Sequence, residues 1–139
     1  MPYPGILPDH PLYFLKAGRD KLAEYAIRDN LQKAKAHLLL SDKRAGMAMM
    51  LIKKGKNDLA ITTFSKGEKY ALKISPLLKR SKQQGVTYTD EMVDTLKKSN
   101  LKHRELLESL LKQMPQGRSE ELKLVLDLNT QVKNQLNSL

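Results

Sequence analysis

The 139-residue chain carries 25 Lys and Arg against 15 Asp and Glu, a formal net charge of +10, and contains no cysteine, which excludes disulfides and thiolate metal sites. Hydrophobic residues make up 40% of the chain, leucine outnumbers valine and tryptophan is absent, a composition that favours helices over sheets. We therefore expect one all-α domain over residues 1–139, attracted to anionic partners.

Four of the six prolines fall within the first eleven residues. Proline fixes its own φ angle and moves the preceding residue away from the α region. We expect residues 1–10 to form an extended arm, and Pro11 to lie in the first turn of a helix over residues 11–27. Asp9 or His10 is the expected N-cap of that helix.

Two further helices are expected before the middle of the chain. Asp29 caps the first of them, which ends at residues 53–55, where two lysines precede a glycine. The next helix begins near residue 57 with Asn57 or Asp58 as its cap, and Pro76 should kink or restart it. The apolar stripe of the first comprises Leu31, Ala34, Leu38, Ala45, Ala48 or Met49, and Ile52; that of the second comprises Ala60, Phe64, Gly67, Ala71, Ile74 and Leu78.

A helical hairpin is expected over residues 89–137. Thr89 caps its first helix, Pro115 and Gly117 end it, and Ser119 opens its second. The first stripe comprises Val93, Leu96, Asn100, His103, Leu107, Leu110 and Met114; the second comprises Leu122, Val125, Asn129, Val132 and Leu136, widened by Leu124 and Leu128. Short connections between long helices predict an up-and-down antiparallel bundle of four to five helices, with front helices over residues 11–83.

Catalytic motifs are absent from the sequence. A di-iron site in a helical bundle needs Glu-x-x-His pairs, but the residues three positions before the histidines are Leu7, Ala34 and Asn100. The sequence has no His-Glu-x-x-His, phosphate loop or Gly-x-Gly-x-x-Gly, and its three histidines fall on separate expected elements. We expect neither an enzyme nor a cofactor.

A soft-metal site is an alternative interpretation of the histidines and methionines. His37 and His103 could converge with Met49 and neighbouring methionines to bind Cu(I). The competing interpretation is that methionines fill gaps in a helical core and that His103 is a polar core position.

Basic residues gather in clusters that could bind anionic partners. Residues 66–104 contain ten Lys and Arg but only four Asp and Glu. Such a surface could contact anionic lipid, a wall polymer or nucleic acid, or could be merely solvated. Nucleic-acid binding is less favoured because Tyr70 and Tyr88 are the only aromatic residues near the cations. The residues expected to bind an anionic partner are Lys53, Lys54, Lys56, Lys79, Arg80 and Lys82.

Residues 6–16 read Ile-Leu-Pro-Asp-His-Pro-Leu-Tyr-Phe-Leu-Lys. This stretch resembles the opening motif, roughly Leu-Pro-Asp-Ser-Pro-Leu-Tyr followed by Leu-Lys, of a bacterial family of exported domains of unknown function. His10 stands where serine is usual. A second similarity, over residues 30–55, includes the pairs Lys33-Ala34 and His37-Leu38 and a Lys-Gly end at residues 54–55. The whole resemblance covers about residues 4–80. It implies an all-helical extracytoplasmic domain whose proline leader is a spacer after a signal peptide or membrane anchor, and it carries over no site residues.

Together these features favour a noncatalytic exported or cell-envelope module that binds anionic lipid or wall polymer. The chain itself has no run of about 18 apolar residues, so it contains no expected transmembrane segment. The alternatives are a cytosolic nucleic-acid-binding module and a copper-binding protein. A protein partner is a further option, because small residues such as Gly67 and Ala71 allow close helix approach, in an interface or within the core.

Overall fold

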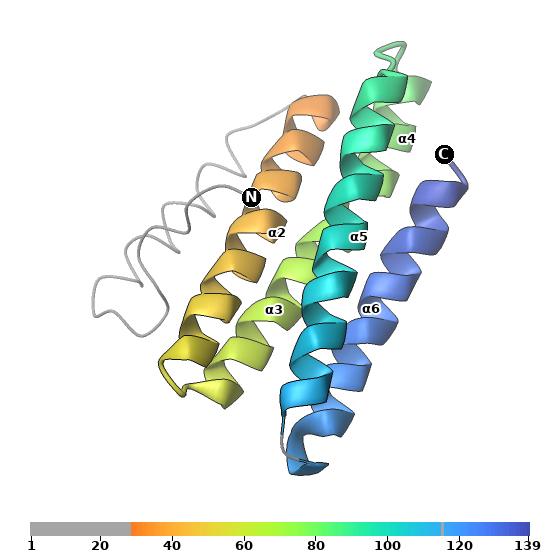
Figure 1. Ribbon diagram of the computed structural model, residues 1–139. Coiled ribbons are helices and arrows are strands. Elements are labelled where there is room, and N and C mark those ends of the chain that lie inside the picture. The colour runs from red at the N-terminus through yellow and green to blue at the C-terminus, as the bar shows by residue number, and fades with distance from the viewer. Residues whose placement is uncertain (1–28, 115) are drawn as a thin grey trace.

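The computed structural model describes residues 29–114 and 116–139, and everything described is helix, turn or short connection (Figure 1). The predicted arm over residues 1–10 and helix over residues 11–27 lie outside this part of the chain. The helices are α2 (Asn30–Lys53), α3 (Asn57–Leu72), α4 (Ile74–Gln83), α5 (Asp90–Gln113) and α6 (Ser119–Asn137), with a 3-10 turn, η1 (Gln116–Arg118), before α6. The all-α prediction is confirmed.

The helix ends follow local sequence signals. The side chain of Asp29 accepts hydrogen bonds from the backbone N–H groups of Leu31 and Gln32, at 2.8 and 3.4 Å, and so caps α2. Thr89 caps α5 in the same way, accepting from the N–H of Met92 at 3.1 Å. Gly55, just after α2, has a φ of 75°, a conformation that costs glycine little. These three predictions are confirmed.

The start of α3 differs from the prediction. Neither Asn57 nor Asp58 is its cap, because the helix already includes both and the cap position is Lys56, which makes no side-chain capping bond. Asp58 lies instead in the first helical turn, where a carboxylate is favourable near the positive end of the helix dipole. Its carboxylate also forms an ion pair with Arg118.

Pro76 separates α3 from α4. A proline at this position has no N–H to donate to the carbonyl of Leu72, and its ring clashes with that carbonyl. The chain responds by ending α3 at Leu72 and starting α4 at Ile74, with Lys73 as the shared boundary residue. The predicted restart is confirmed, and Pro76 occupies the first turn of the new helix.

Consecutive long helices run in opposite directions, so α2 and α3 form one antiparallel hairpin and α5 and α6 form another (Figure 1). The two hairpins pack so that α3 and α6 run in the same direction. α3 packs between α2 and α6, and α6 packs on α5, so α3 and α5 lie diagonally across the bundle. α4 extends beyond α3 and packs beside the beginning of α2. There the side-chain amide of Asn30 donates to Oε1 of Gln84 at 3.0 Å.

The apolar core divides into two clusters. One contains residues of α2, α3, α5 and α6: Ala45, Ala48, Leu51, Ala60, Ile61, Phe64, Leu107, Leu110, Leu122 and Val125. The other, which includes α4, contains Ala34, Ala71, Ile74, Leu77, Leu78, Leu96, Val132 and Leu136. Both clusters draw on the front helices and on the C-terminal hairpin, so the hairpin packs on α2–α4 within one chain.

The stripe predicted for the last helix is partly wrong. Its five principal positions are buried as expected. Leu124, however, is 65% exposed, whereas Leu126 packs against the core in its place. Leu124 follows the buried Leu122 by two positions, about 200° around the helix, and therefore points away from the core.

Candidate functional site

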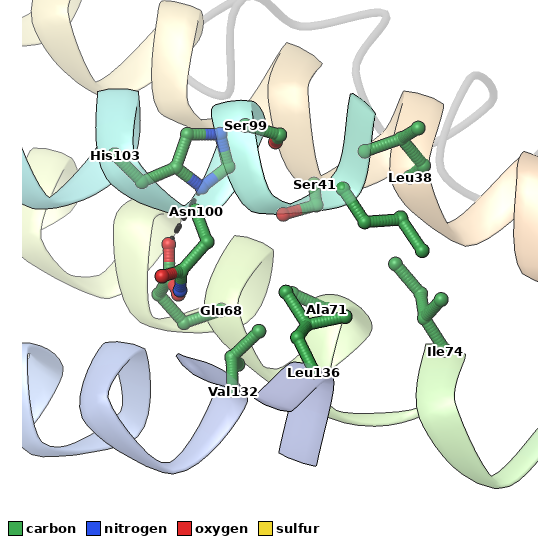
Figure 2. Close-up of a pocket in the computed structure, with 11 residues that line it drawn as sticks. Leu38, Ser41, Glu68, Ala71, Ile74, Ser99, Asn100, His103, Val132 and Leu136 are labelled. Atoms are coloured by element: carbon green, nitrogen blue, oxygen red, sulfur yellow. Dashed lines mark hydrogen bonds and ion pairs between the residues drawn. The ribbon is translucent and has the colours of Figure 1, made fainter. Parts of the chain in front are cut away.

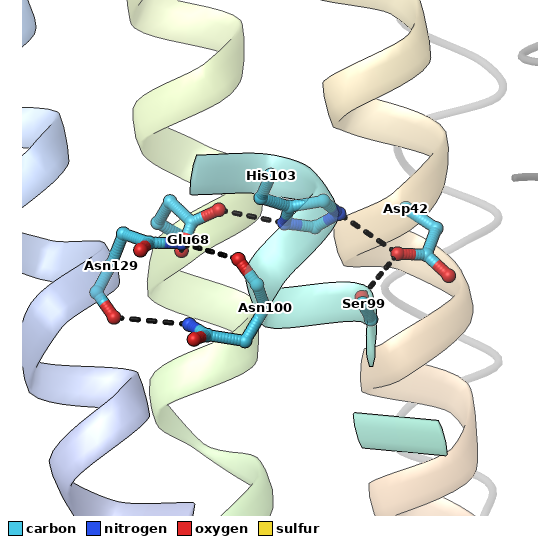
Figure 3. Close-up of polar contacts among 6 residues, drawn as sticks. All are labelled: Asp42, Glu68, Ser99, Asn100, His103 and Asn129. Carbon is cyan, nitrogen blue, oxygen red and sulfur yellow. Dashed lines mark hydrogen bonds and ion pairs between the residues drawn. The ribbon is translucent and has the colours of Figure 1, made fainter. Parts of the chain in front are cut away.

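A polar layer separates the two apolar clusters, and His103 lies at its centre (Figure 3). Nδ1 of His103 lies 2.7 Å from Oε1 of Glu68 on α3. Its other ring nitrogen, Nε2, lies 2.8 Å from Oδ1 of Asp42 on α2. The exposed fraction is only 1% for both His103 and Glu68, so this arrangement places an imidazole between two carboxylates inside the bundle.

Three further side chains extend the layer (Figure 3). The hydroxyl of Ser99 donates to Oδ1 of Asp42 at 2.6 Å. Asn100 and Asn129 form a reciprocal pair between α5 and α6, in which each side-chain amide donates to the other residue's backbone carbonyl, at 3.0 and 3.1 Å. The amide of Asn129 also reaches Oε2 of Glu68 at 3.4 Å. The polar layer, defined as these six residues, therefore connects α2, α3, α5 and α6.

The two carboxylates keep His103 protonated. Burial by itself lowers the pKa of His103, but hydrogen bonds to Asp42 and Glu68 and the negative charges of both outweigh it and raise the pKa to about 9. At neutral pH both ring N–H groups therefore donate. For Asp42 the directions are reversed. Burial by itself raises its pKa, but the hydrogen bonds from His103 and Ser99 and the charge of His103 outweigh burial and lower the pKa overall.

A small cavity adjoins the polar layer (Figure 2). It is lined by apolar side chains of all five helices and by the polar residues Ser41, Glu68, Ser99, Asn100 and His103. Its volume is about 10 Å³, close to the smallest space that holds one water molecule. It cannot admit an organic substrate, so the ionisable groups do not form an open reaction site.

The layer is also poorly arranged to chelate a metal. Asp42 and Glu68 contact opposite nitrogens of the same imidazole, so one ion cannot bind both carboxylates and a ring nitrogen without rearrangement. Within residues 29–114 and 116–139, no group of three or more His, Cys, Asp or Glu side chains is placed to hold a metal ion. The geometry fits a structural ionic cluster better than a metal centre.

The residues of the predicted soft-metal site are not brought together. His37 and Met49 are both on α2, and their separation of twelve positions corresponds to about 18 Å along the helix axis. His37 stacks on Tyr70, with ring centroids 5.5 Å apart, while Met49 packs against an apolar cluster. Both ring nitrogens of His103 already face carboxylates. His103 is therefore a polar core residue, as the competing interpretation holds.

The six lysines and arginines expected to bind an anionic partner are exposed, but they lie at opposite ends of the bundle. Lys53 ends α2, and Lys54 and Lys56 follow it, whereas the other three cations, Lys79, Arg80 and Lys82, lie on α4. The end of α4 contacts the beginning of α2, and the 24 residues of α2 separate the two groups by about 35 Å. The six cations therefore do not lie on one face of the bundle.

Another set of exposed cations lies along α3 and α4. Between Asp58 and Asp90 the only acidic residue is Glu68, which is buried, whereas every Lys and Arg in that interval is exposed. We call this surface the α3–α4 basic stripe. It consists of Lys66, Lys69, Lys73, Lys79, Arg80 and Lys82.

Sequence reasoning found one half of the polar layer and missed the other. Asn100, His103 and Asn129 were placed on buried stripes, and all three are buried. Asp42 and Glu68 were not singled out. A signal for both was present, since Asp42 stands four residues after Leu38 and Glu68 four after Phe64, at helical spacing on their stripes.

Among the described residues no helix is long and apolar enough to cross a membrane. No curated protein and no solved structure matches the chain. A family match does exist over residues 5–117, a range that includes the opening motif at residues 6–16 and passes well beyond residue 80, where the resemblance was expected to end. The polar layer extends past this range, because Asn129 lies on α6. Since the match covers most of the chain, the chain belongs to the family described as a domain of unknown function (DUF5667).

Proposed function

We propose that this chain is a noncatalytic, exported helical module of the bacterial cell envelope that binds an anionic surface, lipid or wall polymer, through the α3–α4 basic stripe. The observation that carries the proposal is the separation of charge on these two helices. Between Asp58 and Asp90 six cations are exposed, and the one acid in that interval, Glu68, is buried beside His103. A surface of this kind attracts polyanions without needing a shaped pocket.

The cations of the stripe are available to a partner. On α3, Lys66, Lys69 and Lys73 recur at spacings of three and four and so share one helical face. Lys79 and Arg80 continue the stripe on α4. None of these five residues forms an ion pair with another described residue, so an anionic partner would not have to displace a carboxylate of residues 29–114 or 116–139.

An exposed leucine lies beside the stripe and bears on the choice of partner. Lys66, Lys69 and Leu124 line a groove of about 270 Å³ between α3 and α6, together with Glu121. Cations beside an exposed apolar side chain suit the interface of an anionic membrane. A soluble wall polymer would use the cations and leave Leu124 in water.

Export is supported by the resemblance of residues 6–16 to the opening motif of exported domains. The alternative, a cytosolic module that binds nucleic acid, is less favoured. Tyr70 stacks on His37 and has the Lys73 ammonium 5.3 Å from its ring centroid, and Tyr88 packs against an apolar cluster. Neither ring offers the open face on which a base could stack.

Binding through the stripe can be tested with a matched pair of variants. K69Q/K79Q/R80Q removes three charges from the stripe, and K98Q/K102Q/K112Q removes three exposed charges from α5. Each cation near an anionic membrane contributes about 1 kcal/mol, so the stripe variant should bind phosphatidylglycerol vesicles or purified wall polymer roughly 100-fold more weakly. Equal binding by the two variants would refute the role of the stripe.

Location requires a separate test in cells. The complete gene is expressed in a related host, and protease is added to intact cells. Degradation of the domain supports export. Protection of the domain, together with recovery in the cytosolic fraction, contradicts it and directs the basic stripe to assays with nucleic acid at two salt concentrations.

A further inference from the structure

A second cationic site lies between α5 and α6. It is a groove of about 160 Å³ lined by Lys97, Leu101 and Arg104 of α5 and by Lys133, Leu136 and Asn137 of α6. Asn100 also contributes to its wall, and no carboxylate lines it. The groove is smaller than the 300–1,000 Å³ pockets that hold drug-sized ligands, so it suits a small group.

The two lysines of this groove have no ion-pair partner within the described residues. Lys97 and Lys133 are both exposed. Two ammonium groups facing one groove repel each other unless an anion lies between them. The placement of these two lysines on separate helices therefore favours an anionic occupant.

Arg104 is held in position at the edge of the same groove. Its Nε donates to Oε1 of Glu108 at 3.2 Å, and its Nη1 donates to Oγ1 of Thr130 on α6 at 3.1 Å. A guanidinium has five N–H donors, so three remain for a ligand after these two bonds. Because its orientation is already fixed, little side-chain entropy is lost when a ligand binds.

We propose that this groove binds a phosphate group. The donors come from four side chains, Lys97, Arg104, Lys133 and Asn137, and a phosphate can accept from all of them, whereas a carboxylate has two oxygens. Arginine matches phosphate geometrically, and lysines add point charges. Leu101, which is 57% exposed, provides an apolar contact for the organic substituent of a phosphate ester.

The site is separate from the α3–α4 basic stripe. The two share no side chain, and α3 and α5 lie diagonally across the bundle (Figure 1). The phosphate groove can therefore be present whether or not the stripe binds an anionic surface. If both bind, one domain can hold phosphate-bearing groups on two sides.

The test is a titration of the full chain, followed by ¹H–¹⁵N NMR, with inorganic phosphate and with glycerol phosphate. We expect saturable shifts at the Asn137 side-chain amide and the Leu101 backbone, with glycerol phosphate binding more tightly than inorganic phosphate. K97Q/K133Q should weaken both affinities at least tenfold. The matched control K98Q/K102Q removes two exposed lysines that do not line the groove and should change them less than twofold.

Two results would overturn the proposal: no saturable shift at the groove in the wild-type chain, or an equal loss of affinity in the control. All substituted side chains are exposed, so both variants should fold, which circular dichroism checks. Phosphatidylglycerol vesicles identify the source of the phosphate. Loss of vesicle binding in K97Q/K133Q indicates a lipid headgroup, whereas unchanged vesicle binding with weakened glycerol phosphate binding indicates a soluble or polymer phosphate.

Discussion

Replacing His103 with glutamine would remove the positive charge that lies between Asp42 and Glu68 in the polar layer. The pKa of His103 rises from 6.5 to about 9 in the folded chain, and each pKa unit corresponds to about 1.4 kcal/mol. The protonated imidazole therefore contributes roughly 3 kcal/mol to folding. Because the variant also leaves two carboxylates without their cation inside the bundle, the total loss should approach 3–5 kcal/mol.

The pH dependence gives the sharper form of this prediction. A folded pKa above the unfolded value means that the stabilisation by His103 is complete below pH 6.5 and is lost as the pH rises through about 9. The wild-type free energy of unfolding should fall by roughly 3 kcal/mol over that interval, relative to H103Q. Asp42, whose pKa is lowered from 3.8, acts in the opposite direction, and its contribution is lost as the pH falls below that value.

The assay is urea unfolding followed by circular dichroism between pH 4.5 and 9.5 at constant ionic strength. S99A is the control, because it removes one hydrogen bond to Asp42 and leaves the charges of the layer in place. A difference between wild type and H103Q that stays constant from pH 6.5 to 9 would refute the argument. So would an NMR titration that places the pKa of His103 at or below 6.5.

Four further substitutions test the packing. Gly67→Ala should lower the melting temperature, because the added Cβ would lie 2.8 Å from Cβ of Arg44. Overpacking costs about 1–3 kcal/mol, which exceeds the roughly 1 kcal/mol that alanine gains over glycine in a helix. A higher melting temperature would contradict this prediction. Asn129→Ala should cost about 1–3 kcal/mol in urea unfolding by leaving buried acceptors unpaired, and an unchanged midpoint would be the contrary result. Leu124→Ser should change the free energy of unfolding by less than about 0.5 kcal/mol, whereas Leu122→Ala, at a fully buried position, should lower it by about 2–5 kcal/mol. Similar urea midpoints for the two variants would show that the buried and exposed faces of α6 are misassigned.

The polar layer also bears on how the bundle selects its register. A shift of one helix by a single turn would move Glu68 or His103 into an apolar cluster without its partner, and an unpaired buried charge is costly. The two apolar clusters alone would tolerate such a shift more easily, because leucine and alanine side chains can exchange neighbours at modest cost. We therefore expect the layer to favour one register of the helices as well as to affect stability.

The sequence by itself determined the helices. Their ends depend on short-range interactions, namely the caps at Asp29 and Thr89, the positive φ at Gly55 and the missing N–H of Pro76. The buried stripes depend on the 3.6-residue period, which placed even the polar positions Asn100, His103 and Asn129 in the core. These features involve residues close together in the chain, so they can be derived without knowing which helices meet.

Only the tertiary structure decided which residues act together. The contacts of His103 with Glu68 and Asp42 span 35 and 61 positions in the chain, and helical periodicity does not specify which helix faces which. The same limit explains why the two groups of cations expected to bind an anionic partner lie at opposite ends of the bundle, while cations of α5 and α6 share a groove. A local pattern fixes the face of a helix on which a side chain lies, but the packing of helices against one another fixes what that side chain meets.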